Sequence, residues 1–220
     1  MASALYWEVE EYCRHYSKGL AALTGPGDCI EFIRGELPTL MGNRGLLEGL
    51  LDSVLKGTGY PDLRGSTMFD NELLLFADEQ RLFSLRMFLW APGEFTPIHD
   101  HSAWGVIGPA IGEMDVINYR PEIPPNADCA RLVETERLRL KPGETTHTLP
   151  LNDGIHKIGN PLEQAMLSLS LYGNPLPRGY IRGFELESGR VYHIFSPRTK
   201  KRRLAAQVLN QIRQTDGSKG

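Results

Sequence analysis

The sequence predicts a mainly β protein with α-helices at its N-terminus and one further helix at its C-terminus. Residues 3 to 56 repeat apolar side chains at intervals of three and four, which is the period of a helix that packs on one face. From about residue 81 the chain changes to short, often alternating segments separated by Gly, Pro, Asn and Asp. Many short strands with turn signals at such spacing are typical of a β-sandwich or barrel.

The N-terminal region divides into three predicted helices. In ALYWEVEEYCRHYSKGLAAL the apolar residues recur with helical period, and Gly25-Pro26-Gly27 ends this run. Asp28 is the predicted N-cap of a second helix, CIEFIRGELPTLM, and a third, RGLLEGLLDSVL, ends at Gly57. We interpret the apolar stripes of these helices as packing faces for the strands that follow.

The predicted strands lie in the second part of the chain, between residues 70 and 196. Turn sequences at 91–93, 141–143 and 187–189 help to separate the segments LFSLRMFLW, WGVIGPAIG, EMDVINY, RLVETERLRL, TTHTL, QAMLSLSLYG, GFELES and RVYHIFS. The final segment, SPRTKKRRLAAQVLNQIRQ, predicts a C-terminal helix that begins near Pro197. Its basic run is interpreted as a solvated face, because the rest of the chain offers no matching basic surface.

Length and charge limit the domain organisation and the partners. A chain of 220 residues fits one domain, here with a helical part at 1–60, a β-barrel at 70–196 and a helix and tail at 197–220. The 24 Lys and Arg residues nearly balance the 27 Asp and Glu residues, which argues against nucleic acid or an anionic membrane as a partner. We see no leader and no apolar run of about 18 residues, so a cytoplasmic location is expected and the oligomeric state stays open.

Two histidine-containing blocks carry the candidate metal ligands. In PIHDHSAWG, a strand would send His99 and His101 to the same face and turn Asp100 to the other face. Two imidazoles on one face can converge on one point inside a barrel. A second block, PLNDGIHKIGN, follows in the strand-rich region and contains His156 and Asn160.

The Gly-x5-His-x-His and Gly-x-His-x3-Asn spacings of these blocks resemble the paired motifs of the cupin superfamily. The resemblance implies a double-stranded β-helix, or jelly-roll, barrel that holds one metal through His99, His101 and His156. Most cupins carry a glutamate as a fourth ligand four or five residues after the second histidine, where this chain has Gly105 and Val106. Imidazole ligands suit Fe, Zn, Cu or Ni. Open coordination positions favour Fe(II) oxygen chemistry, by analogy with the facial-triad oxygenases.

A longer stretch sharpens the resemblance. LFSLRMFLWAPGEFTPIHDHSAWGVIGPAIGEM, followed by GIHKIGN and SLSLYG, is similar to the bacterial branch of the cysteine dioxygenase type I family over roughly residues 70 to 185. That similarity implies a mononuclear non-haem Fe(II) held by the three histidines. It also implies a small thiol, either a mercapto acid or a cysteine-like molecule, that O2 converts to its sulfinate.

The resemblance assigns roles to three further positions. Tyr172 corresponds to the active-site tyrosine of the family, whose phenol would hydrogen-bond the bound oxygen or the substrate carboxylate. Ser168 matches the serine four residues before that tyrosine, and we count both as catalytic candidates. Gly105 occupies the place of the cysteine that cross-links to the tyrosine in the animal enzymes, so no cross-link is expected. Near the second block, His147 is a candidate for orienting a metal ligand.

The expected substrate-binding residues are Arg182 and Asn71. Arg182 is the best match to the carboxylate-binding arginine of the bacterial members, with Arg178 as the next candidate. Asn71 falls near the other substrate-facing position, which is an arginine in the animal enzymes. Ser170 replaces the histidine of the family's usual Ser-x-His-x-Tyr relay. The missing arginine favours a mercapto acid such as 3-mercaptopropionate over cysteine.

Two other functions remain open at this level. The replacement at Ser170 motivates a three-histidine iron dioxygenase with a non-thiol substrate. A non-catalytic cupin, which keeps the metal in a sensor or small-molecule-binding module, is the alternative from a different class. Oxygen uptake with a panel of thiols separates these hypotheses from the thiol dioxygenase.

Overall fold

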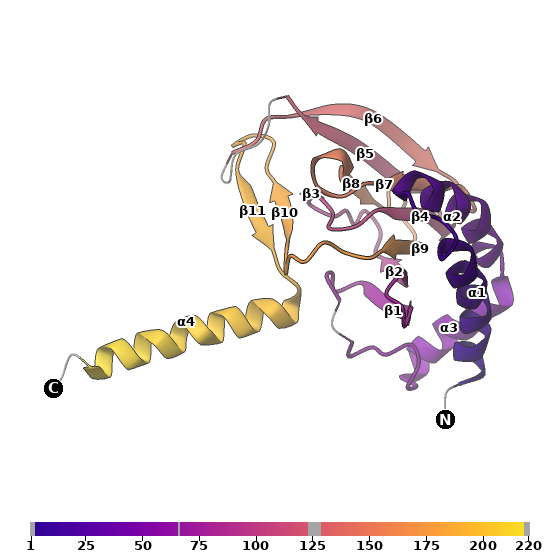
Figure 1. Ribbon diagram of the computed structural model, residues 1–220, viewed down its shortest axis with the longest axis horizontal. Coiled ribbons are helices and arrows are strands. Elements are labelled where there is room, and N and C mark those ends of the chain that lie inside the picture. Colours follow the sequence, from indigo (N-terminus) through magenta and orange to yellow (C-terminus); the bar gives the residue numbers. More distant parts are fainter. Residues whose placement is uncertain (1–2, 66, 123–128, 218–220) are drawn as a thin grey trace.

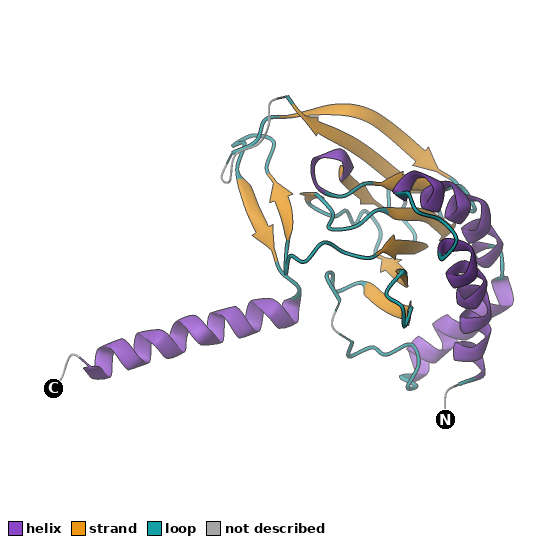
Figure 2. Cartoon of the chain, viewed as in Figure 1, coloured by secondary structure: helices purple, strands orange, loops and turns teal. Residues whose placement is uncertain are grey.

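Two antiparallel sheets face one another in the computed structural model, which describes residues 3–65, 67–122 and 129–217 (Figure 1, Figure 2). The five-stranded sheet has the order β1 (Glu72–Ala77), β2 (Phe83–Trp90), β9 (Met166–Gly173), β4 (Gly105–Ile111) and β7 (Thr146–Thr148). The six-stranded sheet has the order β11 (Val191–Ile194), β10 (Ile181–Phe184), β3 (Ile98–His99), β8 (Ile155–Gly159), β5 (Met114–Pro121) and β6 (Leu132–Leu140). Strands far apart in the chain are therefore neighbours, and the predicted jelly-roll fold is confirmed.

Helices α1 (Ala4–Leu20), α2 (Pro26–Met41) and α3 (Arg44–Lys56) cover the outer face of the five-stranded sheet (Figure 1). Asn43 caps α3 by accepting a hydrogen bond from the backbone N–H of Leu46 at 3.1 Å, and Gly57 ends the helix at a φ of 61°. The prediction that Asp28 caps α2 is wrong. The helix begins at Pro26, whose ring presets the φ of a first helical residue, and Asp28 lies in the first turn, where its charge favours the helix dipole.

Alternation along β9 separates the helix-facing core from the barrel interior. Leu167, Leu169 and Leu171 are buried against the side chains of α1, α2 and α3. The residues between them, Ser168 and Ser170, lie on the opposite face and point into the barrel. The run MLSLSLYG therefore builds a hydrophobic outer face and a polar inner face from a single strand.

The second histidine block begins with a one-turn helix, η1 (Leu151–Gly154), which leads directly into β8. The sequence did not predict β1 or β8, the strand expected to carry both His99 and His101 ends at His99, and the strand expected at GFELES is displaced. β10 ends at Phe184, and residues 185–189 form a turn closed by a hydrogen bond from Glu185 N to Arg190 O at 3.0 Å. These strands are short, so their local sequences hold too few alternations to identify them.

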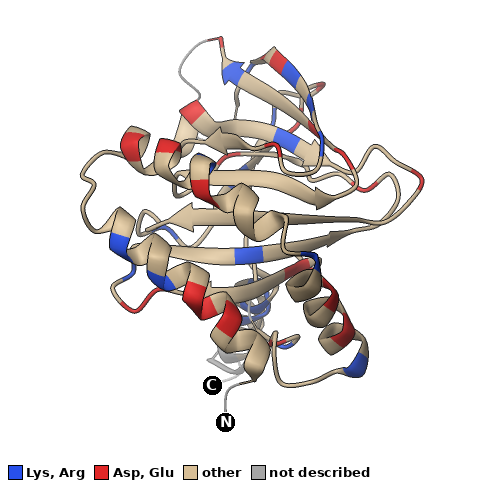
Figure 3. Ribbon diagram, turned by 90° about the vertical axis from the view of Figure 1, so that its right-hand side faces the viewer, with Lys and Arg blue, Asp and Glu red and all other residues tan. Residues whose placement is uncertain are grey.

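Helix α4 (Pro197–Gly217) begins where the sequence predicts and extends away from the barrel (Figure 1). On the face formed by α1, α2 and α3, acidic and basic positions are interspersed (Figure 3). Among the described residues, no helix is both long enough and apolar enough to cross a membrane.

Candidate metal centre

Three histidines meet on the inner wall of the barrel. His99 pairs with His156 across β3 and β8, and His101 follows two residues after His99. The ring centroids lie 4.8 Å apart for His99 and His101, 4.9 Å for His99 and His156, and 4.5 Å for His101 and His156. One possible ligand atom from each residue lies within 4.8 Å of the others. The convergence expected from the sequence is therefore present.

Backbone carbonyls select the tautomer of two of these rings. His99 Nδ1 lies 2.9 Å from Pro97 O, and His101 Nδ1 lies 2.8 Å from Gly154 O. A carbonyl oxygen only accepts, so each Nδ1 carries the proton and each Nε2 keeps a free lone pair. That lone pair is the ligand a metal ion needs.

Burial keeps all three imidazoles neutral. Removal from water lowers the pKa of His99, and it lowers the pKa values of His101 and His156 well below the ordinary value of 6.5. Repulsion from the neighbouring histidines lowers the latter two further. Neutral imidazole is the form that binds metal, so the electrostatics of the site agree with its geometry.

The donor atoms themselves test whether a metal fits. His101 Nε2 and both ring nitrogens of His156 are buried without a hydrogen-bond partner among the described residues. Buried polar atoms rarely lack a partner, and each such atom costs about 1–3 kcal/mol of stability. A metal ion would satisfy these atoms, so the three residues could hold one.

The second histidine block has room only for a glycine at position 154, two residues before His156. A Cβ at this position would lie 1.8 Å from Leu149 O and 2.4 Å from Thr148 Oγ1. The chain therefore turns here with no room for a side chain, and this turn brings the Gly154 carbonyl to His101. The glycine of one block orients a ligand of the other.

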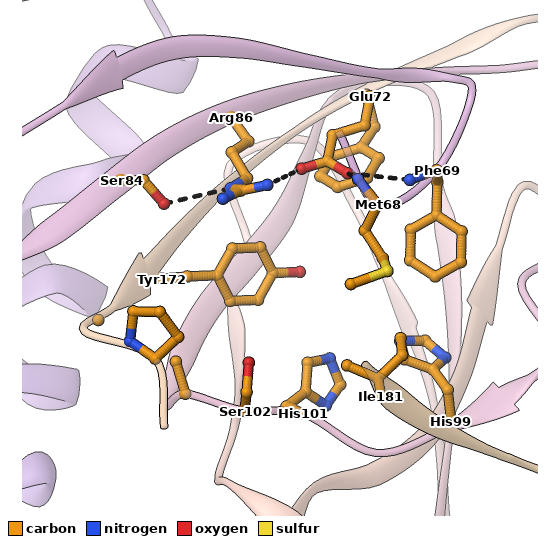
Figure 4. A pocket seen from close by; sticks show the side chains of 14 residues that line it. Met68, Phe69, Glu72, Ser84, Arg86, His99, His101, Ser102, Tyr172 and Ile181 are labelled. Carbon is orange, nitrogen blue, oxygen red and sulfur yellow. Dashed lines mark hydrogen bonds and ion pairs between the residues drawn. The ribbon is translucent and has the colours of Figure 1, made fainter. Parts of the chain in front are cut away.

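A cavity of about 130 Å³ opens onto His99 and His101 (Figure 4). Arg86 and Glu72 lie on the side opposite the histidines, and the Tyr172 ring lies between the two groups. The remaining wall is largely apolar and is formed by Met68, Phe69, Phe88, Ala103, Pro175 and Ile181, with Ser84, Ser102 and Gly173.

An ion pair forms the polar end of this cavity. The Glu72 side chain is 2% exposed, pairs with Arg86 Nη1 and accepts hydrogen bonds from Met68 N at 2.8 Å and Phe69 N at 3.1 Å. Arg86 Nε donates to Ser84 Oγ at 3.1 Å. Among the described residues, none accepts a hydrogen bond from Arg86 Nη2, so this group is available to a ligand.

Tyr172 lines the cavity, as its predicted role requires. Its ring lies 6.0 Å from that of His101, and the Arg86 guanidinium carbon lies 5.8 Å from its centroid. Burial, aided by the charge of Glu72, raises the phenol pKa to about 12. The hydroxyl therefore keeps its proton at neutral pH and can donate a hydrogen bond. Gly105 lies directly opposite Tyr172 in the β4–β9 register, as expected for the position without a cross-link.

Replacing Gly105 by alanine is predicted to displace the Tyr172 ring. A Cβ at Gly105 would lie 2.5 Å from Tyr172 Cδ1, and overpacking of this kind costs about 1–3 kcal/mol. Denaturant unfolding should show this loss for Gly105→Ala and a smaller loss when Tyr172→Ala is already present. Gly179→Ala is the matched control, since a Cβ there meets no atom within 4 Å. Equal effects of Gly105→Ala in both backgrounds would contradict the contact.

Two predicted site residues do not line the cavity. Ser168 is buried within the barrel, where its Oγ accepts a hydrogen bond from Trp90 Nε1 at 2.9 Å. Asn71 lines a different hollow, next to β1. Its backbone carbonyl accepts a hydrogen bond from Leu89 N at 3.0 Å. The neighbouring residue, Glu72, is the one whose side chain reaches the cavity, because successive residues point to opposite sides.

The structure also places Arg182 away from the cavity. Its Nε lies 2.6 Å from Asp100 Oδ2, and its Nη2 donates to Asn152 Oδ1 at 2.7 Å. Arg178 pairs with the same carboxylate. Asp100 thus points away from the metal ligands, as the alternation predicted, and both arginines lie behind the histidines. The cavity instead receives Ile181, the residue before Arg182.

Sequence reasoning missed the two charged residues of the cavity, Glu72 and Arg86. A signal for Arg86 was present in FSLRMFLW, where an arginine shares a strand face with Ser84 and Phe88. A charged residue on the inner face of a largely apolar strand is unusual and marks a buried ion pair or a ligand contact. Glu72 offered no comparable signal, because β1 itself was not predicted.

Solved structures with partial likeness to this chain are cupin-domain proteins of low sequence identity. A cupin 2 domain-containing protein from Halorhodospira halophila is 16% identical, with a TM-score of 0.40 over 56% of this chain and 74% of that chain. A cupin 2 conserved barrel domain protein from Rhodopseudomonas palustris is 12% identical, with a TM-score of 0.39 over 54% and 68%.

A third likeness is to a cupin 2 conserved barrel domain protein from Salinispora arenicola, which is 14% identical at a TM-score of 0.37 over 51% and 83% of the two chains. No protein-family model matches the chain. The jelly-roll assignment rests on the strand pairing described above.

Proposed function

We propose that this protein is a non-haem Fe(II)-dependent thiol dioxygenase that oxidises a small thiol acid to its sulfinate. The observation that carries the proposal is a small cavity lined on one side by His99 and His101, two of the three clustered imidazoles, and on the other by an arginine. In the reaction, RSH and O2 combine to RSO2H, so sulfur gains both oxygen atoms and is oxidised as O2 is reduced. Bound Fe(II) would supply adjacent open positions for the thiolate and for O2.

Arg86 is the residue we assign to the substrate carboxylate, in place of Arg182. It is the one arginine among the cavity-lining residues, and its Nη2 is available to a ligand. Glu72 holds the guanidinium in place through Nη1, so little side-chain freedom is lost on binding. Arg86 lies opposite Ser170 in the β2–β9 register.

Tyr172 and the apolar wall supply the other requirements of the reaction. With its pKa raised to about 12, the phenol remains a hydrogen-bond donor toward the reacting atoms. Phe69 contacts the His99 ring edge-to-face at 5.5 Å, and with Phe88 and Ile181 it limits the entry of water. Exclusion of water strengthens the hydrogen bond from Tyr172 and the ion pair with Arg86.

Removing only the phenol oxygen tests the role of Tyr172. Tyr172→Phe should leave the iron content unchanged and lower kcat by about tenfold to a hundredfold, the effect of one hydrogen bond to a charged group. Iron analysis and oxygen uptake on the same sample measure both quantities. Unchanged turnover would show that the tyrosine serves packing alone.

The proposed reaction is tested by aerobic incubation of the iron-loaded protein with 3-mercaptopropionate, cysteine and cysteamine. We expect one O2 to be consumed per sulfinate formed, with a thiol acid as the best substrate and no uptake by zinc-loaded protein. Uptake with none of these thiols would contradict the thiol dioxygenase. The non-thiol dioxygenase is the second candidate, because both Ser170 and the position of Arg182 depart from the expected thiol site.

A further inference from the structure

The backbone of His101 is not held by strand pairing. β3 consists of Ile98 and His99 alone, and its ladder contacts connect His99 to Gly183 of β10 and to His156 of β8. His99 therefore lies between paired strands on both sides. His101 lies beyond the end of the strand, so other contacts must determine where its imidazole stands.

Two donors from outside β3 hold the His101 carbonyl. Leu151 N donates to it at 2.8 Å, and Leu151 adopts a φ of 62°, which a bulky residue other than glycine adopts only when its surroundings impose it. The second donor is Arg178 Nη2 at 2.6 Å. The hydrogen bond from Arg178 is charge-assisted and is shorter than the one from Leu151.

Arg178 is itself held by Asp100, which stands between the two ligands in the sequence. Nη2 lies 2.7 Å from Asp100 Oδ1 and Nη1 lies 3.0 Å from Oδ2, a two-pronged ion pair. Asp100 is fully buried, and the Arg178 side chain is 14% exposed. One guanidinium thus connects the carboxylate of residue 100 to the carbonyl of residue 101.

Arg182 can be compared directly with Arg178. It pairs with the same carboxylate through Nε at 2.6 Å, and its side chain is 19% exposed. Its guanidinium also contacts Asn152 and the Phe184 ring, and no hydrogen bond joins it to His101. Both arginines therefore share burial, charge and partner, and they differ in their contact with the metal ligand.

We propose that Arg178, oriented by Asp100, is a positioning residue that sets the location of the His101 ligand atom. The inference rests on the three-histidine metal centre and does not depend on the thiol reaction. A shift of the His101 carbonyl moves the ring relative to Gly154 O and to the other two imidazoles. Residues that orient a metal-binding side chain without binding the metal themselves typically contribute about tenfold to a hundredfold in metal affinity.

Titration with Co²⁺ tests this role in the metal-free full chain. We compare wild type with Arg178→Met and Arg182→Met, following the dissociation constant and the visible absorption spectrum of bound Co²⁺. Arg178→Met should weaken binding by about tenfold or more and shift the spectrum, because one ligand moves. Arg182→Met should retain the wild-type spectrum and an affinity within about a factor of two, since it touches no ligand. Both should lower the free energy of unfolding.

Equal effects of the two substitutions on affinity and spectrum would overturn the role of Arg178 and leave a purely structural ion-pair cluster. Should Arg178→Met not fold, Arg178→Lys keeps the charge but cannot reach both acceptors in the same way. Weaker Co²⁺ binding by that variant supports the proposal, and wild-type binding overturns it. A wild-type protein that binds no Co²⁺ would overturn the metal centre itself.

Discussion

Replacing His156 by alanine is expected to remove the metal from the protein. Neither ring nitrogen of His156 has a hydrogen-bond partner among the described residues, so the substitution deletes a ligand without breaking a hydrogen bond. Structural zinc sites with four ligands bind with about 10–16 kcal/mol, so one ligand contributes on the order of 3 kcal/mol, about a hundredfold in affinity. Elemental analysis after desalting should fall from about one metal per chain to nearly none.

His147→Ala is the control for this experiment. His147 is exposed on β7 and does not belong to the cluster of possible ligand atoms. The metal content of His147→Ala should match that of the wild type. Full metal retention by His156→Ala, or equal loss in both variants, would show that the three-histidine assignment is wrong. The substitution also removes a buried imidazole that has no hydrogen-bond partner. Without metal, we therefore expect the free energy of unfolding of His156→Ala to lie at most about 1 kcal/mol below that of the wild type.

Replacing Arg86 by methionine is expected to have the second large effect, first on stability. The substitution leaves the Glu72 carboxylate buried without its cation, and breaking a buried ion pair costs about 3–5 kcal/mol. We expect the lower end of that range, because Met68 N and Phe69 N still donate to Glu72. Denaturant unfolding measures the loss.

The double substitution Glu72→Gln with Arg86→Met separates stability from function. Removing both charges should recover most of the lost free energy of unfolding, since no uncompensated charge remains. This folded, uncharged cavity should still bind metal, but its KM for thiol acids should rise by about a hundredfold through loss of the carboxylate contact. Arg182→Met should leave the KM near the wild-type value. A raised KM in Arg182→Met alone would return the carboxylate-binding role to that residue.

Most of the fold was accessible from the sequence because its signals are local. The helical periodicity before residue 56, the alternation in MLSLSLYG and the helix beginning at Pro197 each depend on neighbours within one turn or one strand. The same holds for two of the three ligands. His99 and His101 reach the same side although β3 ends at His99, and the resemblance of the Gly-x-His block to a cupin motif identified His156.

The charged residues at the polar end of the cavity could not be predicted from local sequence in this way. Asn71 and Glu72 are adjacent, and a difference of one position decides which of them reaches the metal side. Arg182 was predicted at the substrate, yet its neighbour Ile181 lines the cavity. In both cases the residue next to the predicted one lines the cavity, since strand alternation reverses with a shift of one residue.

The sequence by itself determined the jelly-roll class, the three histidines and the outward direction of Asp100, because helix period, strand alternation and motif spacing are properties of contiguous residues. Only the tertiary structure decided which charges share the cavity with those histidines. That outcome depends on the register of β1, β2 and β9, which places Arg86 beside Glu72 and opposite Ser170. Register is set by the packing of whole sheets, and no single segment contains that information.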